Sequence, residues 1–479
     1  MKTVFISGNF NILHPGHIRL FKFARECGDK VIIGIFGDNL VKEKNYLKED
    51  DRMESVKSIS IVDEVHVIKK SLQDTINRIK PDIVLKGKEH ENLYNEELNI
   101  LKKFKGKLIF ASGSSSLSST NLINRELSDN KTFKISFPQK FMKRHNITKN
   151  KLTDLLSKFK NLNVCVIGDL IIDEYVHCDT LGMSHEDSTI VVSPSERKKF
   201  IGGSGIVAAH AAGLGAKVNY ITVVGKDSEM KFAEKKLASY GVNTSFFEDE
   251  SRPTTVKQRF INDSKSLLRV SNLQQHAISE SIQDKITLKL KKFLKNTDIL
   301  IFSDFNYGSL PQRLLNKIEK IKKKKSIICV ADSQSSSQTG NIARFMNMDL
   351  ILPTEREARI SLRNNEDGLA VISDKLMKEA KSRYIILKLG SDGLLVEDSF
   401  AKGKGKINDW YTDRLTAFNS NPVDVAGAGD SLMVGSSLVL AAGGNIWEGS
   451  LIGSIMASIQ VSRQGNIPIK VKELFGEFN

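Results

Sequence analysis

The sequence predicts an α/β protein made of two domains, each built on a parallel sheet. Short apolar segments rich in β-branched residues alternate with helical patterns, which is typical of βα units whose strands run parallel. Most of the predicted strands end in glycine or polar residues, so ligand sites are expected along the carboxyl edge of each sheet. At 479 residues the chain is too long for one ordinary hydrophobic core, which indicates two domains.

The bulk composition is that of a globular protein and disfavours membrane-spanning, secreted and nucleic-acid-binding proteins. Hydrophobic residues make up 40% and charged residues 27% of the chain, and no apolar run is long enough to span a bilayer. The N-terminus leads straight into a predicted strand rather than a signal peptide, so we expect a cytoplasmic protein without a membrane partner. The net charge of +15 comes from lysines spread over helical faces without interleaved aromatic residues, which favours anionic substrates over nucleic acid.

The four cysteines predict neither a disulfide framework nor a metal site. They are scattered without Cys-x-x-Cys spacing in or near apolar sequence, and we expect reduced, mostly buried thiols. They are Cys27, Cys165, Cys178 and Cys329.

The first predicted unit consists of a strand, a glycine turn and a helix. The strand spans Thr3–Gly8, the turn carries His14 and His17, and the helix covers Ile18–Cys27. Pro15-Gly16 turns the chain, so both imidazoles can face a point just before the helix, and such a pair suits phosphate contacts. Two histidines that cap the helix are the alternative. Zinc is disfavoured, because no third ligand follows at a suitable spacing.

Further βα units follow, and two of them carry candidate phosphate contacts. A strand at Lys30–Phe36 leads to a Lys-rich segment with Lys42 and then to Arg52 at the start of a helix. A final strand, Lys107–Ala111, precedes a Ser-rich stretch and another helix. Hydroxyls and amides at a helix start form a phosphate cradle, and a flexible linker is the alternative. The predicted cradle includes Ser119 and Thr120.

These motifs resemble the cytidylyltransferase-like nucleotidyltransferases, and in particular the adenylyltransferase half of bacterial bifunctional heptose kinase/adenylyltransferases. The resemblance covers nearly all of residues 1–127 and rests on Gly8–His17, Arg52-Met53, Leu85–Gly87 and Ser118–Asn121. It implies a Rossmann-like domain with His14 and His17 as catalytic residues. The residues implied to contact the nucleotide are Gly8, Asn9, Phe10, His14, His17, Lys42, Arg52, Ser119 and Thr120. The family usually has Asp where this chain has Asn11, which puts substrate binding or metal support there in question.

Residues 131–150 are expected to form an exposed linker. They mix charges without a clear period and contain Pro138. A helix with one apolar face, Leu152–Phe159, then opens the second domain. The predicted domains are therefore residues 1–130 and residues 151–479.

The first part of the second domain carries candidate sugar-binding residues. A buried strand is followed by Asp169 and Asp173, and carboxylates at a strand end can bind sugar hydroxyls, although one or both can simply cap a turn. Gly202-Gly203 precede an alanine-rich helix, which alone is a weak signal. Two short strands, Thr254–Ile261 and Ser266–Val270, form a hairpin signal that fits a small β lid over the sugar.

The stretch Asp424–Ser431 predicts a phosphate site. Its small residues let backbone N–H groups approach a phosphate, and the apolar run Leu432–Ala442 is expected to be the following helix, whose N-terminus favours negative charge. Asp430 would lie at the head of that helix, where it can accept a proton from an attacking hydroxyl. A glycine-rich turn that caps a core helix is the alternative. The small residues are Gly427, Ala428 and Gly429.

Together with the strand ends before it, this stretch resembles the ribokinase-like carbohydrate kinases across residues 160–470, and most of all the heptose 7-phosphate kinase half of the same bifunctional enzymes. The closest segments are Val166–Tyr175, Phe302–Phe305 and the glycine-rich stretch itself. The resemblance implies a ribokinase-like α/β domain with a small β lid. It implies Asp430 as catalytic base, Gly427, Ala428 and Gly429 as the anion hole, Lys388, Gly390 and Gly393 near the nucleotide, Glu357 near Mg²⁺, and Asp173, Gly202 and Gly203 on the sugar.

Three residues depart from this family's pattern. Thr354 stands where the family has Asn, Ile206 stands where an Asn often meets the sugar, and Gln334 replaces a familiar Lys. The phosphate site is intact and the sugar pocket is altered, which favours a change of substrate over a weakened kinase. The domain order is also reversed, since the kinase comes first in the known bifunctional enzymes.

The leading hypothesis is a bifunctional enzyme of nucleotide-activated sugar synthesis. The second domain would phosphorylate a sugar phosphate, with heptose 7-phosphate as the expected substrate, using ATP and Mg²⁺. The first would join a sugar 1-phosphate to a nucleotide with release of pyrophosphate, giving ADP-heptose. The choice between ATP and CTP and the presence of a homodimer stay open. The alternatives are a cytidylyltransferase fused to a kinase for another sugar or polyol, and a nucleotide-sensing or scaffold protein with degenerate sites.

Overall fold

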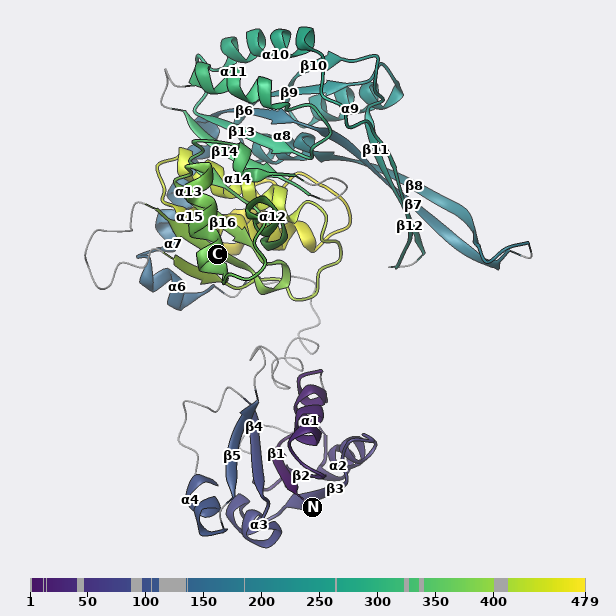
Figure 1. The fold of residues 1–479 in the computed structure, drawn as a ribbon, viewed down its shortest axis with the longest axis vertical. Coiled ribbons are helices and arrows are strands. Elements are labelled where there is room, and N and C mark those ends of the chain that lie inside the picture. The colour runs from purple at the N-terminus through teal and green to yellow at the C-terminus, as the bar shows by residue number, and fades with distance from the viewer. Residues whose placement is uncertain are drawn as a thin grey trace. The chain divides into compact units, whose positions relative to one another are not determined.

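Two units make up the chain, residues 1–132 and residues 133–479 (Figure 1). Both consist of helices packed on a largely parallel sheet, as the βα alternation predicted. The computed structural model describes residues 2–11, 13, 15–40, 47–87, 97–104, 106–111, 135, 137–184, 186–262, 265–322, 327–335, 340–399 and 412–478.

The first unit has a five-stranded parallel sheet in the order β3-β2-β1-β4-β5. Its strands are β1 (Thr3–Gly8), β2 (Lys30–Phe36), β3 (Glu64–Ile68), β4 (Ile83–Gly87) and β5 (Lys107–Ala111). The strand order reverses between β1 and β4, and a doubly wound sheet opens a ligand crevice at such a point. The carboxyl ends of β1 and β4 therefore border the expected site.

Helices cover both faces of this sheet. They are α1 (Pro15–Cys27), α2 (Glu49–Lys57), α3 (Leu72–Ile79), α4 (Glu97–Leu101) and the single 3₁₀ turn η2 (Lys102–Phe104). Val4 and Ile6 pack with Phe21 of α1 in one core, whereas Phe5 packs with Ile76 of α3 in another. Because successive side chains of a strand point to opposite faces, this two-sided burial accounts for the nearly continuous apolar strands.

The second unit is organised around a nine-stranded sheet in the order β10-β9-β6-β13-β14-β15-β16-β17-β18. The strands from β10 to β16 run parallel, and β17 and β18 add an antiparallel edge. The strands are β6 (Asn163–Gly168), β9 (Lys217–Val224), β10 (Asn243–Glu248), β13 (Ile299–Asp304), β14 (Ile328–Ser333), β15 (Leu350–Ile351), β16 (Tyr384–Lys388), β17 (Leu394–Asp398) and β18 (Thr412–Leu415).

Helices also cover both faces of the larger sheet. One core contains residues of α6 (Gln139–Arg144), α7 (Lys149–Lys158), α8 (Ser204–Gly213), α9 (Ser228–Ser239), α14 (Ala428–Ala441), α15 (Ile446–Val461) and α16 (Val471–Phe478). The other contains residues of α10 (Glu280–Phe293), α11 (Gln312–Lys322), α12 (Glu355–Leu362) and α13 (Leu369–Ala380). The remaining turns are η3 (Phe159–Asn161), η4 (Ile342–Arg344) and η5 (Gly390–Asp392). Among the described residues, no helix is long and apolar enough to cross a bilayer.

A separate four-stranded sheet in the order β12-β11-β7-β8 forms the lid. Its strands are β7 (Leu170–Met183), β8 (Ile190–Gly203), β11 (Thr255–Asn262) and β12 (Lys265–Asn272). The hairpin of β11 and β12 was expected, whereas the long ribbon of β7 and β8 was not. The outer part of that ribbon projects from the body of the second unit (Figure 1), and its residues are largely exposed. Strands exposed on both faces lack the apolar alternation of a half-buried strand, which is why the sequence pattern did not predict them.

The described part of residues 131–150 differs from the exposed linker that we expected. Phe141 and Met142 of α6 are buried in the core of the second unit. Arg144 and His145 both contact the carboxylate of Asp413, and the His145 ring stacks on Trp447. This segment therefore packs against the second unit and contributes to its fold.

Candidate active sites

A glycine at the start of α14 shapes the phosphate end of the main cavity. Gly427 has φ of 75°, a left-handed conformation that favours glycine, and a side chain there would collide with the carboxamide of Asn466. Gly427, Ala428 and Gly429 line a cavity of about 790 Å³. The first amides of α14 have no intrahelical acceptor, so this end of the cavity suits an anion.

Asp430 lies in the first turn of the same helix. It lines the cavity, only 5% of it is exposed, and its Oδ1 has no hydrogen-bond partner among the described residues. The pKa of Asp430 is raised to about 7, chiefly by burial and then by the negative charge of Asp332, while Lys388 opposes the rise. A carboxyl group with this pKa can accept a proton near neutral pH.

Lys388 brings a positive charge to the cradle. It ends β16, lines the cavity, and donates to Asp332 Oδ2 at 2.6 Å. A Cβ atom at Gly429 would lie 3.4 Å from its Nζ, so the ammonium group lies directly beside the cradle. Burial disfavours the charged form, but the attraction of Asp332 and then Glu357 outweighs it and the pKa of Lys388 is raised.

Gly390 and Gly393 lie in the turn that follows Lys388, and both line the cavity. Their φ angles are 61° and 89°, and a side chain at Gly393 would collide with the carbonyl of Leu415. Glycine is therefore needed to keep this backbone close to the cavity.

Glu357 faces the same cavity from α12. Its Oε1 accepts from the backbone N–H of Ser335 at 3.0 Å, and its Oε2 accepts from the backbone N–H of Thr354 at 2.7 Å. The Thr354 hydroxyl in turn accepts from the Glu357 N–H, which completes a capping box. Both carboxylate oxygens thus already have a backbone partner.

The lid end of the cavity contains the expected Asp173. Its Oδ2 accepts from Asn466 Nδ2 at 3.0 Å, and it lines the cavity together with Gly203. A side chain at Gly202 would collide with this carboxylate. Ile206, by contrast, is fully buried in the core and does not line the cavity. The structure therefore brings Asp173 and the two glycines together.

Asp169 lies elsewhere, and its geometry differs from the sugar contact that we expected. It is 3% exposed and does not line the cavity. Its Oδ2 accepts from the backbone N–H groups of Phe305 at 2.7 Å and Tyr307 at 3.5 Å. Burial and then the charge of Asp304 raise the pKa of Asp169 to about 6. In the described structure this carboxylate therefore holds the turn after β13.

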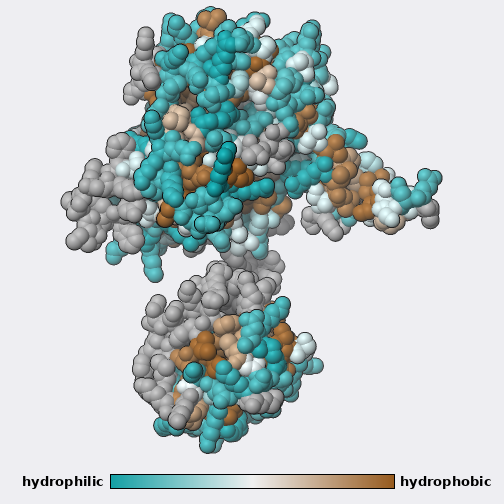
Figure 2. Space-filling view, in the orientation of Figure 1, coloured by the Kyte–Doolittle hydropathy of each residue, from teal (hydrophilic) through white to brown (hydrophobic). Residues whose placement is uncertain are grey.

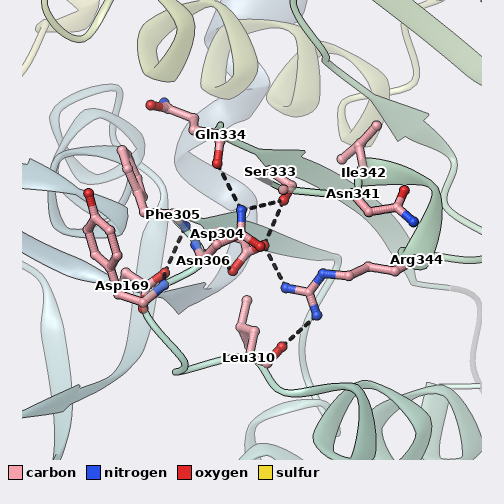
Figure 3. A network of polar contacts seen from close by, with 12 residues as sticks. Asp169, Asp304, Phe305, Asn306, Leu310, Ser333, Gln334, Asn341, Ile342 and Arg344 are labelled. Atoms are coloured by element: carbon pink, nitrogen blue, oxygen red, sulfur yellow. Dashed lines mark hydrogen bonds and ion pairs between the residues drawn. The ribbon is translucent and has the colours of Figure 1, made fainter. Parts of the chain in front are cut away.

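A polar network continues from that turn (Figure 3). Asp304 Oδ2 accepts from Arg344 Nη2 at 2.6 Å and from the Ser333 hydroxyl at 2.7 Å. Asn306 donates through Nδ2 to the carbonyl of Gln334 at 2.8 Å. These contacts join the ends of β13 and β14, and they fix the turn that carries Phe305, whose side chain lines the cavity.

Three basic residues of the lid were missed by the sequence reasoning. Lys257, Arg259 and Arg269 all line the cavity from β11 and β12. Lys257 and Arg259 are two positions apart, so they share one face of the strand. This alternation was a usable signal once the hairpin had been interpreted as a lid.

In the first unit, the turn after β1 holds part of the predicted nucleotide site. Phe10 follows Gly8 and Asn9, is buried, and has φ of 50°, which is uncommon for a bulky residue. Its ring packs edge-on against His17 of α1, with the centroids 5.0 Å apart. The Oδ1 of Asn11 is buried without a partner among the described residues. The predicted residues His14, Lys42, Ser119 and Thr120 lie outside the described residues.

Arg52 has a different position from the phosphate contact that we expected. Its side chain is 0% exposed. The guanidinium donates to the carbonyls of Asn9 at 2.7 Å, Phe36 at 3.0 Å and Leu47 at 3.2 Å, and to Asp38 Oδ1 at 2.6 Å. Arg52 therefore holds the turn after β1 against the end of β2 from inside the unit.

Comparison with known proteins identifies the second unit. Residues 161–472 match the family model described as pfkB family carbohydrate kinase. The chain belongs to the pfkB family of carbohydrate kinases. Residues 5–125 match the cytidylyltransferase-like model, so this family member carries a nucleotidyltransferase-like domain ahead of the kinase domain. Both predicted fold families are confirmed.

Curated relatives of this pfkB family member include bifunctional enzymes. It is 28% identical over 324 residues to the bifunctional protein HldE of Desulfatibacillum aliphaticivorans, a match that covers 67% of this chain and 63% of the relative. The HldE protein of Nitratiruptor sp. is 26% identical over 316 residues, covering 65% of this chain and 64% of the relative. The chain thus spans slightly less than two thirds of these relatives.

Solved structures resemble the kinase fold. Ribokinase of Arabidopsis thaliana, solved in complex with ribose and ATP, superposes with a TM-score of 0.53 at 18% identity over 66% of this chain and 99% of that structure. Phosphofructokinase-2 of Escherichia coli gives a TM-score of 0.54 at 16% identity, covering 66% of this chain and 98% of that structure. At these identities the likeness establishes the fold alone.

Proposed function

We propose that the chain is a bifunctional enzyme that phosphorylates a sugar phosphate with ATP and transfers a nucleotide to a sugar 1-phosphate. The observation that carries the kinase half is the setting of Asp430. Its unpartnered carboxylate oxygen lies in the first turn of α14, beside the cradle Gly427–Gly429 and near Lys388. A base, an anion site and a cation together are what phosphoryl transfer requires.

In this proposal Asp430 takes the proton of the acceptor hydroxyl. The hydroxyl oxygen forms a bond to the terminal phosphorus of ATP, the bond from that phosphorus to the bridging oxygen breaks, and ADP leaves. The amides of Gly427–Gly429 and the ammonium group of Lys388 stabilise the charge on the transferring group. The pKa of Asp430, about 7, leaves a substantial fraction ionised at neutral pH.

Mg²⁺ is the metal that we propose to accompany ATP. Glu357 brings a carboxylate to the cavity, and oxygen ligands are those that Mg²⁺ prefers. The backbone N–H groups of Ser335 and Thr354 fix the orientation of the Glu357 carboxylate, which would help to hold the ion. When bound, Mg²⁺ supplies positive charge to the phosphate oxygens.

The acceptor that we propose carries a phosphate of its own. Lys257 and Arg269 of the lid line the same cavity as Asp173, and a neutral sugar has no group that needs two cations. Heptose 7-phosphate is the proposed acceptor, because both units resemble the bifunctional heptose kinase/adenylyltransferases and the relatives are HldE proteins.

For the first unit we propose nucleotidyl transfer at the turn after β1. The phosphate of a sugar 1-phosphate attacks the α-phosphorus of ATP and pyrophosphate leaves, which would yield ADP-heptose. His14 and His17, with Lys42, Ser119 and Thr120, are proposed to contact the phosphates. The cytidylyltransferase-like match of residues 5–125 supports this assignment.

The decisive experiment measures ADP and pyrophosphate separately. The full chain is incubated with Mg·ATP and heptose 7-phosphate, fructose 6-phosphate or ribose, and then with ATP or CTP and heptose 1-phosphate. We expect ADP with heptose 7-phosphate and pyrophosphate with ATP and heptose 1-phosphate. Asp430→Asn should abolish only ADP formation, while Asp154→Asn, which changes an exposed carboxylate on α7, should change neither product.

Other outcomes separate the alternatives. ADP only with another sugar would identify a kinase of different specificity, and pyrophosphate only with CTP would identify a cytidylyltransferase. If neither product forms with any substrate while ATP still binds, the protein is a nucleotide sensor or scaffold and the enzymatic proposal is wrong.

We also propose a homodimer formed through the lid ribbon. Figure 2 shows hydrophobic residues gathered on this ribbon, where Met183 pairs with Ile190 and both are more than half exposed. A dimer would cover this apolar surface. Sedimentation should show a dimer that Met183→Ser weakens. Leu288→Ser, at an exposed leucine of α10, should have no effect on the dimer, and a monomeric wild-type chain would contradict the proposal.

A cytoplasmic location is proposed from the sequence alone.

A further inference from the structure

A carboxylate just before the cradle contacts the lid. Asp424 Oδ2 accepts from the Tyr175 hydroxyl at 2.5 Å and from the backbone N–H of Gly465 at 3.0 Å. Its Oδ1 accepts from the backbone N–H of Ala426 at 3.0 Å. Burial opposes ionisation, but the hydrogen bonds from Tyr175, Ala426 and Gly465 outweigh it and lower the pKa of Asp424. The charged carboxylate therefore fixes the backbone that leads into Gly427.

Tyr175 is placed between this carboxylate and an arginine of the lid. It belongs to β7, is 2% exposed, and packs its ring edge-on against Phe200 with the centroids 5.3 Å apart. Arg259 of β11 donates to the Tyr175 hydroxyl at 3.1 Å, and its guanidinium lies 5.1 Å from the centroid of the ring. The hydroxyl thus links the lid to Asp424.

Arg259 also lies between two carboxylates of different function. Its Nη2 is 3.7 Å from Asp173 Oδ1, which lines the cavity, and its Nη1 is 3.7 Å from Asp424 Oδ1, just before the cradle. These distances exceed a hydrogen bond, so both are electrostatic contacts. An acceptor that binds at Asp173 would change the surroundings of Arg259, and Arg259 acts on Asp424 both directly and through the Tyr175 hydroxyl.

We propose that Tyr175 and Arg259 are positioning residues that couple the acceptor site to the phosphate cradle, so that the acceptor and ATP bind with positive cooperativity. The inference rests on the proposed kinase function but assigns roles to residues outside the reacting groups. Coupling of this kind is reciprocal, because each ligand must change the affinity of the other by the same factor. The proposed coupling passes from the acceptor at Asp173 through Arg259 and Tyr175 to Asp424, and from there to the backbone amides of the cradle.

Tyr175→Phe is the most selective test, because it removes only the hydroxyl and keeps the ring against Phe200 and Arg259. Calorimetry would give the dissociation constant of a non-hydrolysable ATP analogue with Mg²⁺, alone and with saturating heptose 7-phosphate. In the wild-type chain we expect the acceptor to tighten analogue binding about fivefold or more. In Tyr175→Phe this factor should fall towards one, while the affinity without acceptor changes less than twofold. Tyr240→Phe, at the C-terminal end of α9 and outside the cavity lining, is the matched control and should keep the wild-type factor.

A second measurement needs no acceptor. Binding of the ATP analogue alone should slow amide hydrogen exchange in β11 of the wild-type chain and have little effect there in Tyr175→Phe. Arg259→Lys should lose the same protection, because a single ammonium group cannot contact both carboxylates and the hydroxyl in the manner of a guanidinium. This variant serves as the test if Tyr175→Phe fails to fold.

The outcomes distinguish the inference from the proposed function. An unchanged coupling factor in Tyr175→Phe, or equal protection of β11 in all variants, would overturn the inference even if ADP is formed. If heptose 7-phosphate does not bind the wild-type chain, the proposed acceptor is wrong, and the exchange measurement with the ATP analogue still decides the coupling.

Discussion

The pKa of Asp430 predicts the pH dependence of the kinase reaction. The carboxylate must be ionised to accept a proton, and its pKa is about 7. About one tenth of the molecules are ionised at pH 6 and about nine tenths at pH 8, so the rate should rise about tenfold between these values. Both substrates should be kept well below their KM, because the rate then reports the free enzyme.

Two neighbouring charges should move this profile in opposite directions. Asp332 raises the pKa of Asp430, so Asp332→Asn should shift the rise in rate to lower pH. Lys388 lowers that pKa, so Lys388→Met should shift the rise to higher pH. Removal of a neighbouring charge changes a pKa by on the order of one unit. Both variants should also lower the maximal rate, because each disrupts the ion pair beside the cradle.

The assay is ADP release at constant ionic strength between pH 5.5 and 9, with Asp154→Asn as the control that keeps the wild-type profile. Circular dichroism across the same range separates unfolding from titration. A rate that is flat between pH 6 and 8, or a shift of both variants in the same direction, would refute the assignment of Asp430 as the titrating base.

Three further predictions follow from single contacts. Asp430→Asn should lower ADP formation at least about a hundredfold and should raise thermal stability more at pH 8 than at pH 5. The reason is that the pKa of Asp430 is raised in the folded state, so its ionisation destabilises the fold as the pH rises towards 7. An equal gain in stability at both pH values would contradict this. Arg52→Met should destabilise the first unit by about 3 kcal/mol or more in chemical unfolding, because buried carbonyl groups lose their hydrogen-bond donor. The same variant should abolish the release of pyrophosphate but not that of ADP. Loss of pyrophosphate release with unchanged stability would instead favour a direct contact between Arg52 and phosphate. Gly427→Ala should weaken binding of an ATP analogue by about tenfold or more in calorimetry, because residue 427 has a left-handed backbone and a Cβ atom there would collide with Asn466. Gly443→Ala is the control: Gly443 also has a positive φ but lies in open space, so binding should be unchanged.

The parts of the site that could be predicted from the sequence are those determined by local backbone. Gly427 and Gly429 beside the apolar pattern of α14 already specify amides at a helix start, whatever the rest of the fold. Gly390 and Gly393 likewise follow a strand directly. These residues line one cavity because parallel strands present their carboxyl ends at one edge of the sheet.

Long-range packing limited the rest of the prediction. Asp169 and Asp173 both follow the same buried strand, but Asp169 occupies the turn between β6 and β7, where the amides after β13 reach it. Arg52 has the composition of a phosphate ligand, and only the fold reveals that three carbonyl groups and Asp38 surround it. Contacts between residues distant in sequence decide these two orientations, and no local pattern records them.

The departures from the family pattern have unequal consequences in the structure. Thr354 replaces Asn at a helix N-cap. The side chains of Thr and Asn can both accept a hydrogen bond from a backbone N–H there, and the Thr354 hydroxyl does so. Gln334 lines the cavity without the charge of the Lys that it replaces, but Lys388 contributes a cation to the same cavity. Ile206, in contrast, is buried in the core and does not line the cavity, so its side chain does not contact a ligand there. The phosphate end is therefore preserved in chemistry, and a change in specificity is expected at the lid end, where Lys257, Arg269 and Asp173 contact the acceptor in our proposal.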